Sequence, residues 1–133
     1  MIAQVHRAPR QMNDRGSGSV LAIAMMAVFT FTGLTIAASA QIITARASAT
    51  AAADAAALAA APMTFPPVAG GRSPLAEASR LARSNGATLV SCLCPRVATF
   101  APRRVEVTVR FPVDLPIVGL QWIEGSSAAE FVP

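Results

Sequence analysis

Residues 19–40 and 41–61 read SVLAIAMMAVFTFTGLTIAASA and QIITARASATAAADAAALAAA, and these two adjacent runs decide the fold of the chain. Neither run contains Pro, and Gly33 is the only Gly in them, so they predict one uninterrupted helix. At about 1.5 Å per residue, this helix is roughly 60–65 Å long. Because the hydrocarbon core of a bilayer is only about 30 Å thick, we expect the second half to stand outside the membrane.

The first run satisfies the length requirement for a membrane span. The thirty residues Gly16–Ala45 carry no formal charge, and about twenty apolar residues are enough to cross a bilayer as a helix. Three arginines lie in the tail at 1–15, whereas Arg46 is the first charge after the run. Because basic flanks stay inside, we expect residues 1–15 to be a cytoplasmic tail and the C-terminus to lie outside.

Two questions about the first run stay open on the sequence alone. Gly33, Ala37 and Ala40 share one helix face, which suits helix–helix packing but is also ordinary in an Ala-rich sequence. Ala38-Ser39-Ala40 forms an A-x-A site, so cleavage by a signal peptidase after Ala40 is the alternative to an uncut anchor. The uncharged core exceeds the usual h-region of about 7–15 residues, which favours an uncut anchor.

The second run is an alanine-rich rod. Twelve of the seventeen residues at 45–61 are Ala, which favours helix strongly but buries little area per side chain. We therefore expect this rod to pack against similar rods or under a small domain. Asp54, four residues before Leu58, is either solvated or paired with an arginine of a neighbouring chain.

The remaining residues begin with a linker and a helix. Residues 62–74 contain four Pro and two Gly within PMTFPPVAGGRSP, as a turn or linker does. Residues 75–85 alternate apolar and charged side chains at helical spacing, and Asn85-Gly86 closes this short helix in the manner of a left-handed cap.

Strands follow the helix. Residues 87–94 and 104–111 alternate with a period of two, which predicts an antiparallel sheet with one buried face. Pro112 and Pro116 limit the next segment to edge strand or irregular structure. The pattern allows a third short strand near 117–123, and the last ten residues read as a loose tail. We therefore expect residues 75–133 to form a small extracytoplasmic domain, and the whole chain to be an α+β protein.

The inventory for catalysis is small. His6 is the only His, Lys is missing, and we find no nucleophile, phosphate-binding or H-E-x-x-H motif. We therefore expect no enzyme, no cofactor and no metal site. The formal net charge of +4 comes from arginines spread along the chain, which does not indicate nucleic-acid binding.

Cys92 and Cys94 occupy positions i and i+2 of a predicted strand. Such side chains lie on one face with their Cα atoms about 7 Å apart, at or beyond the usual disulfide limit. A strained or intermolecular disulfide and two buried thiols therefore both stay open. Two thiolates without a His make only a weak metal site.

Two stretches resemble the TadE/TadG-like pseudopilins. One is Arg15-Gly16-Ser17-Gly18-Ser19-Val20 leading into the apolar run, and the other is Arg46 followed by AADAAALAAA at 52–61, which includes Asp54 and Leu58. That family typically has a basic tail, a glycine before the span and a rod of this composition. The later NGATLVSC and V-x-V-x-V stretches are similar to short TadE-like proteins encoded among secretion genes of high-GC bacteria.

The resemblance implies a pilin-like structural or accessory subunit of a tight-adherence pilus or secretion assembly in the bacterial cell membrane, with other membrane subunits as partners. A prepilin peptidase would cut after Gly16 and leave Ser17 as the new N-terminus. Five residues past that cut, pilin-like proteins carry a Glu that compensates a neighbouring subunit's amine, but this chain has Leu21. Processing and filament entry therefore do not follow from the resemblance. The second hypothesis is an extracytoplasmic binding domain released after Ala40.

Overall fold

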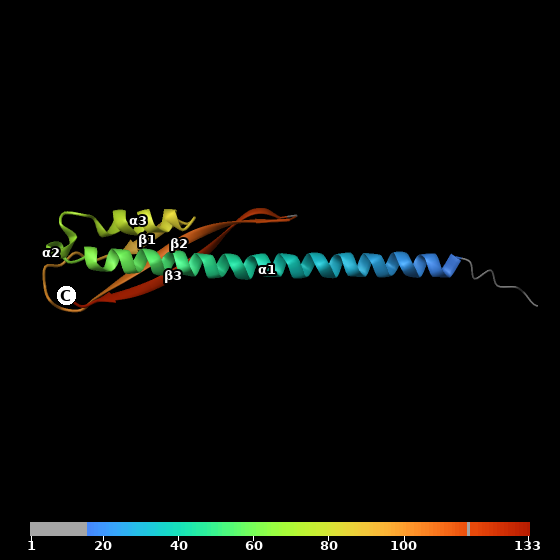
Figure 1. The fold of residues 1–133 in the computed structure, drawn as a ribbon, viewed down its shortest axis with the longest axis horizontal. Coiled ribbons are helices and arrows are strands. Elements are labelled where there is room, and N and C mark those ends of the chain that lie inside the picture. The colour runs from blue at the N-terminus through green and yellow to red at the C-terminus, as the bar shows by residue number, and fades with distance from the viewer. Residues whose placement is uncertain (1–15, 117) are drawn as a thin grey trace, which may run out of the picture. The chain divides into compact units, whose positions relative to one another are not determined.

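The computed structural model describes residues 16–116 and 118–133, so the expected cytoplasmic tail at 1–15 lies outside the described residues. The elements follow in the order α1 (Ser17–Met63), α2 (Pro66–Ala69), α3 (Pro74–Ser84), β1 (Thr88–Leu93), β2 (Arg103–Leu115) and β3 (Gly119–Phe131). A long apolar helix followed by small helices and an antiparallel sheet confirms the α+β class (Figure 1). The chain divides within α1 into two compact units, residues 1–36 and 37–133.

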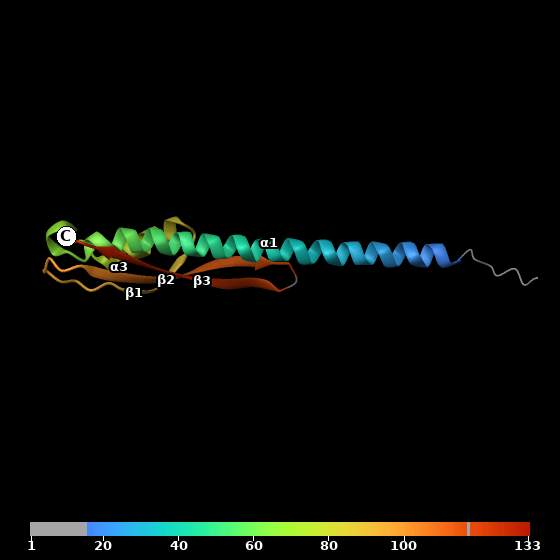
Figure 2. The same cartoon turned by 90° about the horizontal axis from the view of Figure 1, so that it is seen from below.

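The sheet is a three-stranded antiparallel meander in the order β1-β2-β3. Val105, Val107 and Val109 of β2 are buried, whereas the alternate residues Arg104 and Glu106 are exposed. The predicted period-two alternation of this strand is therefore confirmed. Within residues 37–133, α3 and the second half of α1 both lie on the buried side of the sheet (Figure 2).

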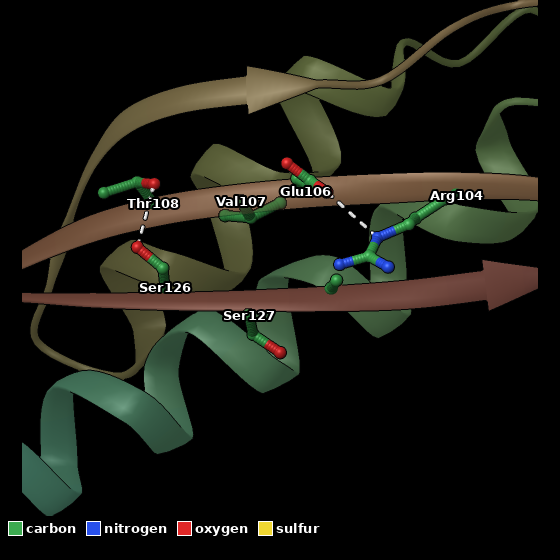
Figure 3. Close-up of a pocket in the computed structure, with 7 residues that line it drawn as sticks. Arg104, Glu106, Val107, Thr108, Ser126 and Ser127 are labelled. Carbon is green, nitrogen blue, oxygen red and sulfur yellow. Dashed lines mark hydrogen bonds and ion pairs between the residues drawn. The ribbon is translucent and has the colours of Figure 1, made fainter.

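The middle of the other face of the sheet is polar. Arg104 Nε lies 2.9 Å from Glu106 Oε1, and the hydroxyls of Thr108 and Ser126 are 3.1 Å apart across β2 and β3 (Figure 3). The ion pair is more than half exposed on the Arg104 side, so we expect it to contribute little to stability.

The C-terminal residues are not a loose tail, and this prediction was wrong. β3 reaches Phe131 and pairs with β2 along its whole length, from Arg103 opposite Phe131 to Leu115 opposite Gly119. Gly125 and Ala129, which lie on the face of β3 toward the helices, are buried. A third short strand was expected near 117–123, but small residues have weak strand propensity on their own, so the sequence pattern did not reveal that this strand continues to Phe131.

Two proline-containing segments that were expected to be irregular contain regular structure. The range 62–74 contains the short helix α2 and the buried side chain of Phe65. β2 runs through Pro112, but there it pairs only with β3, because β1 ends its pairing opposite Arg110. This arrangement confirms that the proline lies in an edge-like section of the sheet.

α3 is the predicted amphipathic helix. Ala78 and Ala82 are buried, and Gly86 at φ 75° follows the C-cap Asn85, as a left-handed terminus requires. The side-chain hydrogen bond from Arg80 lowers the pKa of the Glu77 carboxyl.

Arg103 joins the loop at 97–101, which precedes it, to Thr64, which lies 39 residues earlier in the sequence. Its guanidinium donates to the carbonyl oxygens of Thr64 at 3.2 Å and Ala101 at 3.4 Å, and also to those of Val97 and Thr99. The same group lies 5.2 Å from the centroid of the Phe65 ring. Arg103 is only 7% exposed. If its guanidinium were removed, little water could therefore reach these carbonyl oxygens to hydrogen-bond with them. Arg103 therefore ties the loop between β1 and β2 to the end of α1.

Replacing Arg103 with Met should lower the free energy of unfolding of residues 37–133 by about 3 kcal/mol, because several buried carbonyls lose their donor. The matched control is Arg104→Met, one residue along on the exposed face, which should change stability by less than about 0.5 kcal/mol. Urea unfolding of the full chain in detergent, followed by circular dichroism, measures both. Equal effects of the two substitutions would contradict the role given to Arg103.

Candidate functional site: the two halves of helix α1

The first half of α1 exposes apolar side chains on all sides. The large side chains between residues 20 and 36 are each 47–73% exposed; they are Val20, Leu21, Ile23, Met25, Met26, Val28, Phe29, Phe31, Leu34 and Ile36. A helix that is apolar all round requires apolar surroundings on every side. Among the described residues, α1 is the one helix long and apolar enough to span a membrane, and its most apolar stretch of 18 residues has a mean hydropathy of 2.2.

The hydroxyl groups in this half are satisfied by the helix itself. Thr30 and Thr32 each donate to the carbonyl oxygen four residues earlier, both at 2.8 Å, and Thr35 donates to Thr32 O at 2.8 Å. A hydroxyl that bonds back to its own helix leaves no polar group unpaired in hydrocarbon. These threonines are therefore compatible with a lipid environment.

The residues of the proposed prepilin-type cut lie at the start of α1. Gly16 immediately precedes the helix and is exposed, and Ser19 Oγ donates to its carbonyl oxygen at 3.1 Å. α1 begins at Ser17, and its first turn carries no acidic residue. Leu21 is 65% exposed and continues the apolar surface. Cleavage after Gly16 stays a prediction.

The small residues of the predicted packing face are uncovered. A Cβ atom on Gly33 would meet nothing within 4 Å, and Ala37 and Ala40 are exposed. Ala40 also borders a surface cavity whose other wall includes Phe111 and Val113. Packing of this face against a second helix stays a prediction.

The second half of α1 provides much of the core of residues 37–133. Its buried alanines are Ala45, Ala49, Ala52, Ala53, Ala56, Ala57, Ala60 and Ala61. Those from Ala52 onward form one cluster with the valines of β2, with Ala129 of β3 and with Ala78 and Ala82 of α3. The Ala-rich rod was expected to pack either against similar rods or under a small domain, and in this structure it packs under a small domain.

Gly125 explains how an alanine face can serve as a core. A Cβ atom built on Gly125 would lie 2.5 Å from the carbonyl carbon and oxygen of Ala49 and 2.8 Å from the nitrogen of Thr50. The backbones of β3 and α1 are therefore in direct contact. We did not identify Gly125 from the sequence, because EGSSAAE at 124–130 has no period-two pattern of apolar residues.

The residues of the rod motif lie on the uncovered side of α1. Asp54 Oδ1 accepts a hydrogen bond from Ser127 Oγ of β3, a partner that we did not expect from the sequence. Leu58 is 67% exposed, and Arg46 lines a surface cavity together with Trp122. The structure thus connects Asp54 to its own domain.

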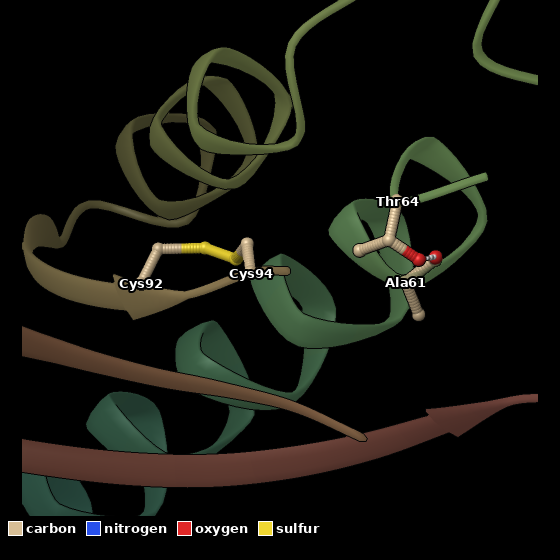
Figure 4. Close-up of a disulfide and its surroundings, with 4 residues drawn as sticks. All are labelled: Ala61, Thr64, Cys92 and Cys94. Atoms are coloured by element: carbon tan, nitrogen blue, oxygen red, sulfur yellow. Dashed lines mark hydrogen bonds between the residues drawn. A yellow bond between two sulfur atoms is a disulfide. The ribbon is translucent and has the colours of Figure 1, made fainter. Parts of the chain in front are cut away.

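Cys92 and Cys94 are joined by a disulfide near the end of α1, where Thr64 Oγ1 donates to Ala61 O at 2.6 Å (Figure 4). Their Cα atoms are 5.4 Å apart, closer than in a regular strand, because β1 ends at Leu93 and Cys94 lies beyond it. Among residues 16–116 and 118–133, His, Cys, Asp and Glu form no group of three that could hold a metal ion.

Comparison with known families identifies the same helix. Residues 16–63 match the family described as Tad, putative Flp pilus-assembly TadE/G-like. The matched range agrees with α1 to within one residue, so the resemblance inferred from the sequence is confirmed for this part of the chain. Searches of curated proteins and of solved structures give no match. The family description indicates a pilus-assembly component, and α1 is compatible with a membrane anchor.

Replacing Gly125 with Ala should destabilise residues 37–133 by about 1–3 kcal/mol, since the added methyl forces the β3 and α1 backbones apart. The control is Gly33→Ala, where the new Cβ meets open space. Thermal unfolding of the full chain in detergent, followed by the β-sheet signal, separates the two. An unchanged midpoint for Gly125→Ala would show that the backbones can separate without cost.

Proposed function

We propose that this chain is a membrane-anchored, pilin-like structural component of a Flp-type pilus-assembly apparatus. The observation that carries the proposal is the division of α1 into an apolar half exposed on every side and an alanine-rich half covered by its own domain. The TadE/G-like match over the same residues supports it. In this proposal the N-terminus faces the cytoplasm and residues 37–133 face outward.

The covered rod limits how this chain meets its neighbours. In a bundle of pilin-like rods, each helix packs against others along its length. Here the buried alanines from Ala52 to Ala61 already pack against β2, β3 and α3. The outer part of α1 therefore offers partners only an uncovered strip that includes Ile43, Asp54 and Leu58. An accessory or capping position fits this strip better than the interior of a filament.

Anchoring by α1 is tested with Val28→Asp. Val28 is 61% exposed within the apolar half, and a carboxylate near the middle of a span costs about 3 kcal/mol in insertion. We expect a large loss of the chain from carbonate-washed membranes. Val90→Asp, at a site 50% exposed on β1, is the matched control and should stay in the membrane. Equal retention of both variants would refute the anchor.

Orientation is tested by protease treatment. We expect external protease to digest residues 37–133 in spheroplasts and to leave them intact in inverted membrane vesicles. The positive-inside arrangement of the basic tail is the reason for this expectation. Digestion only in inverted vesicles would place the domain in the cytoplasm and overturn the proposed topology.

Processing is tested by sequencing the N-terminus of the mature protein from cells with an active prepilin peptidase. A start at Ser17 supports a processed pseudopilin, and Gly16→Leu should then restore Met1, whereas the control Gly18→Leu should still be cut. A start at Met1 in the unmodified chain indicates a plain anchor. A start at Gln41 indicates the alternative, an extracytoplasmic binding domain released after Ala40.

A further inference from the structure

The end of the β2–β3 hairpin is apolar and uncovered. We define the hairpin end as residues 111–123, of which Ile117 is not described. Asp114 is the only charged residue in this range, which reads FPVDLPIVGLQWI. Val118, Leu120 and Trp122 are 65%, 58% and 49% exposed. Exposed large apolar side chains in a cluster indicate a surface that meets another apolar phase.

The hairpin end lies beside a particular section of α1. One surface cavity is lined by Ile42 and Arg46 of the helix and by Leu115 and Trp122 of the hairpin, among others. A second cavity brings Phe111 and Val113 to the helix residues from Ala40 to Ser48. Both cavities lie within residues 37–133. The hairpin end is therefore level with helix residues 40–48.

That section of the helix is where the uncharged run ends. Gly16–Ala45 contains thirty residues without a formal charge, about ten more than a hydrocarbon core requires. The residues just before Arg46 therefore fall in the headgroup region when the apolar half of α1 is in the bilayer. Because the hairpin end is level with them, it reaches the same region.

The chemistry of the hairpin end fits this depth. Trp122 is the only Trp in the chain, and the guanidinium of Arg110 lies 4.8 Å from the centroid of its ring. Trp is enriched at membrane–water interfaces, where its ring is half in the apolar phase, and arginines there contact lipid phosphates. Arg46 supplies a second guanidinium at the cavity that Trp122 lines.

From these observations we propose that the hairpin end, with Val118, Leu120 and Trp122, is a second membrane contact that inserts into the lipid headgroup region beside α1. This inference rests on the proposed anchoring by α1. Its occupant is the lipid surface, and the bilayer contact fixes residues 37–133 against the membrane. Burial of the same residues against a second copy of the chain is the competing outcome.

The fluorescence of Trp122 tests the proposal without interference from another Trp or any Tyr. The full chain is reconstituted into vesicles of phosphatidylcholine and phosphatidylglycerol that carry nitroxide quenchers either at the headgroup, near the top of the acyl chain or near the bilayer centre. We expect blue-shifted emission, with the strongest quenching by the two shallow probes. Emission quenched by aqueous acrylamide but not by any lipid probe would overturn the proposal.

Variants identify which side chains insert. Val118→Ser combined with Leu120→Ser should reduce quenching by the shallow lipid probes severalfold, because both side chains are exposed and lose their affinity for lipid. Leu93→Ser, at a site 65% exposed on β1, is the matched control and should leave quenching unchanged. Circular dichroism checks that each variant keeps its sheet. Equal quenching in all three proteins would overturn the assignment.

Two further outcomes separate this proposal from others. Vesicle flotation reports anchoring: a chain that floats but has a water-exposed Trp122 keeps the anchor and loses the second contact, whereas a chain that does not float loses both. Blue-shifted emission that appears only at a high protein-to-lipid ratio, without lipid quenching, assigns the hairpin end to contact between two copies and overturns the lipid proposal.

Discussion

The contact between the backbones of β3 and α1 is the constraint on which residues 37–133 depend. Gly125 leaves no room for a side chain against Ala49 and Thr50, and alanines line the facing side of the helix. Alanine removes little apolar area from water, but a close approach of two backbones adds many dispersion contacts. The small residues on both sides thus compensate for the missing bulk. In consequence, the second half of α1 is part of the folded core rather than a stalk below it.

Much of the fold can be predicted from the sequence, because the spacing of large apolar residues indicates which helix or strand face is buried or in contact with lipid. The uncharged run predicts the helix, and Val105, Val107 and Val109 predict the central strand with its buried face. The second half of β3 was not predicted, because Gly125, Ser127 and Ala129 are neither hydrophobic enough nor strand-favouring enough to form a period-two signal. These small residues allow β3 to pack closely against the alanines of α1. The pattern of one segment does not show which other segment it packs against.

The missed features of the site have a similar physical origin. The separation expected for Cys92 and Cys94 assumed a regular strand, and the strand ends between them. Arg103 was not singled out because its partners are backbone carbonyls from separate segments rather than an acidic side chain. Asp54 was assigned to solvent or to a neighbouring chain, whereas Ser127 reaches it from the section of β3 that was expected to be a loose tail.

The covered alanine face also bears on assembly. A pilin-like rod and a rod-bearing domain compete for the same helix surface, and in this chain the domain occupies it from Ala45 onward. Exchange of that surface for a second rod would expose the buried valines of β2, at roughly 1.5–3 kcal/mol for each side chain. A partner that keeps the domain in place avoids this cost. Under the proposed function, association through the apolar half of α1 is therefore the arrangement that leaves this packing intact.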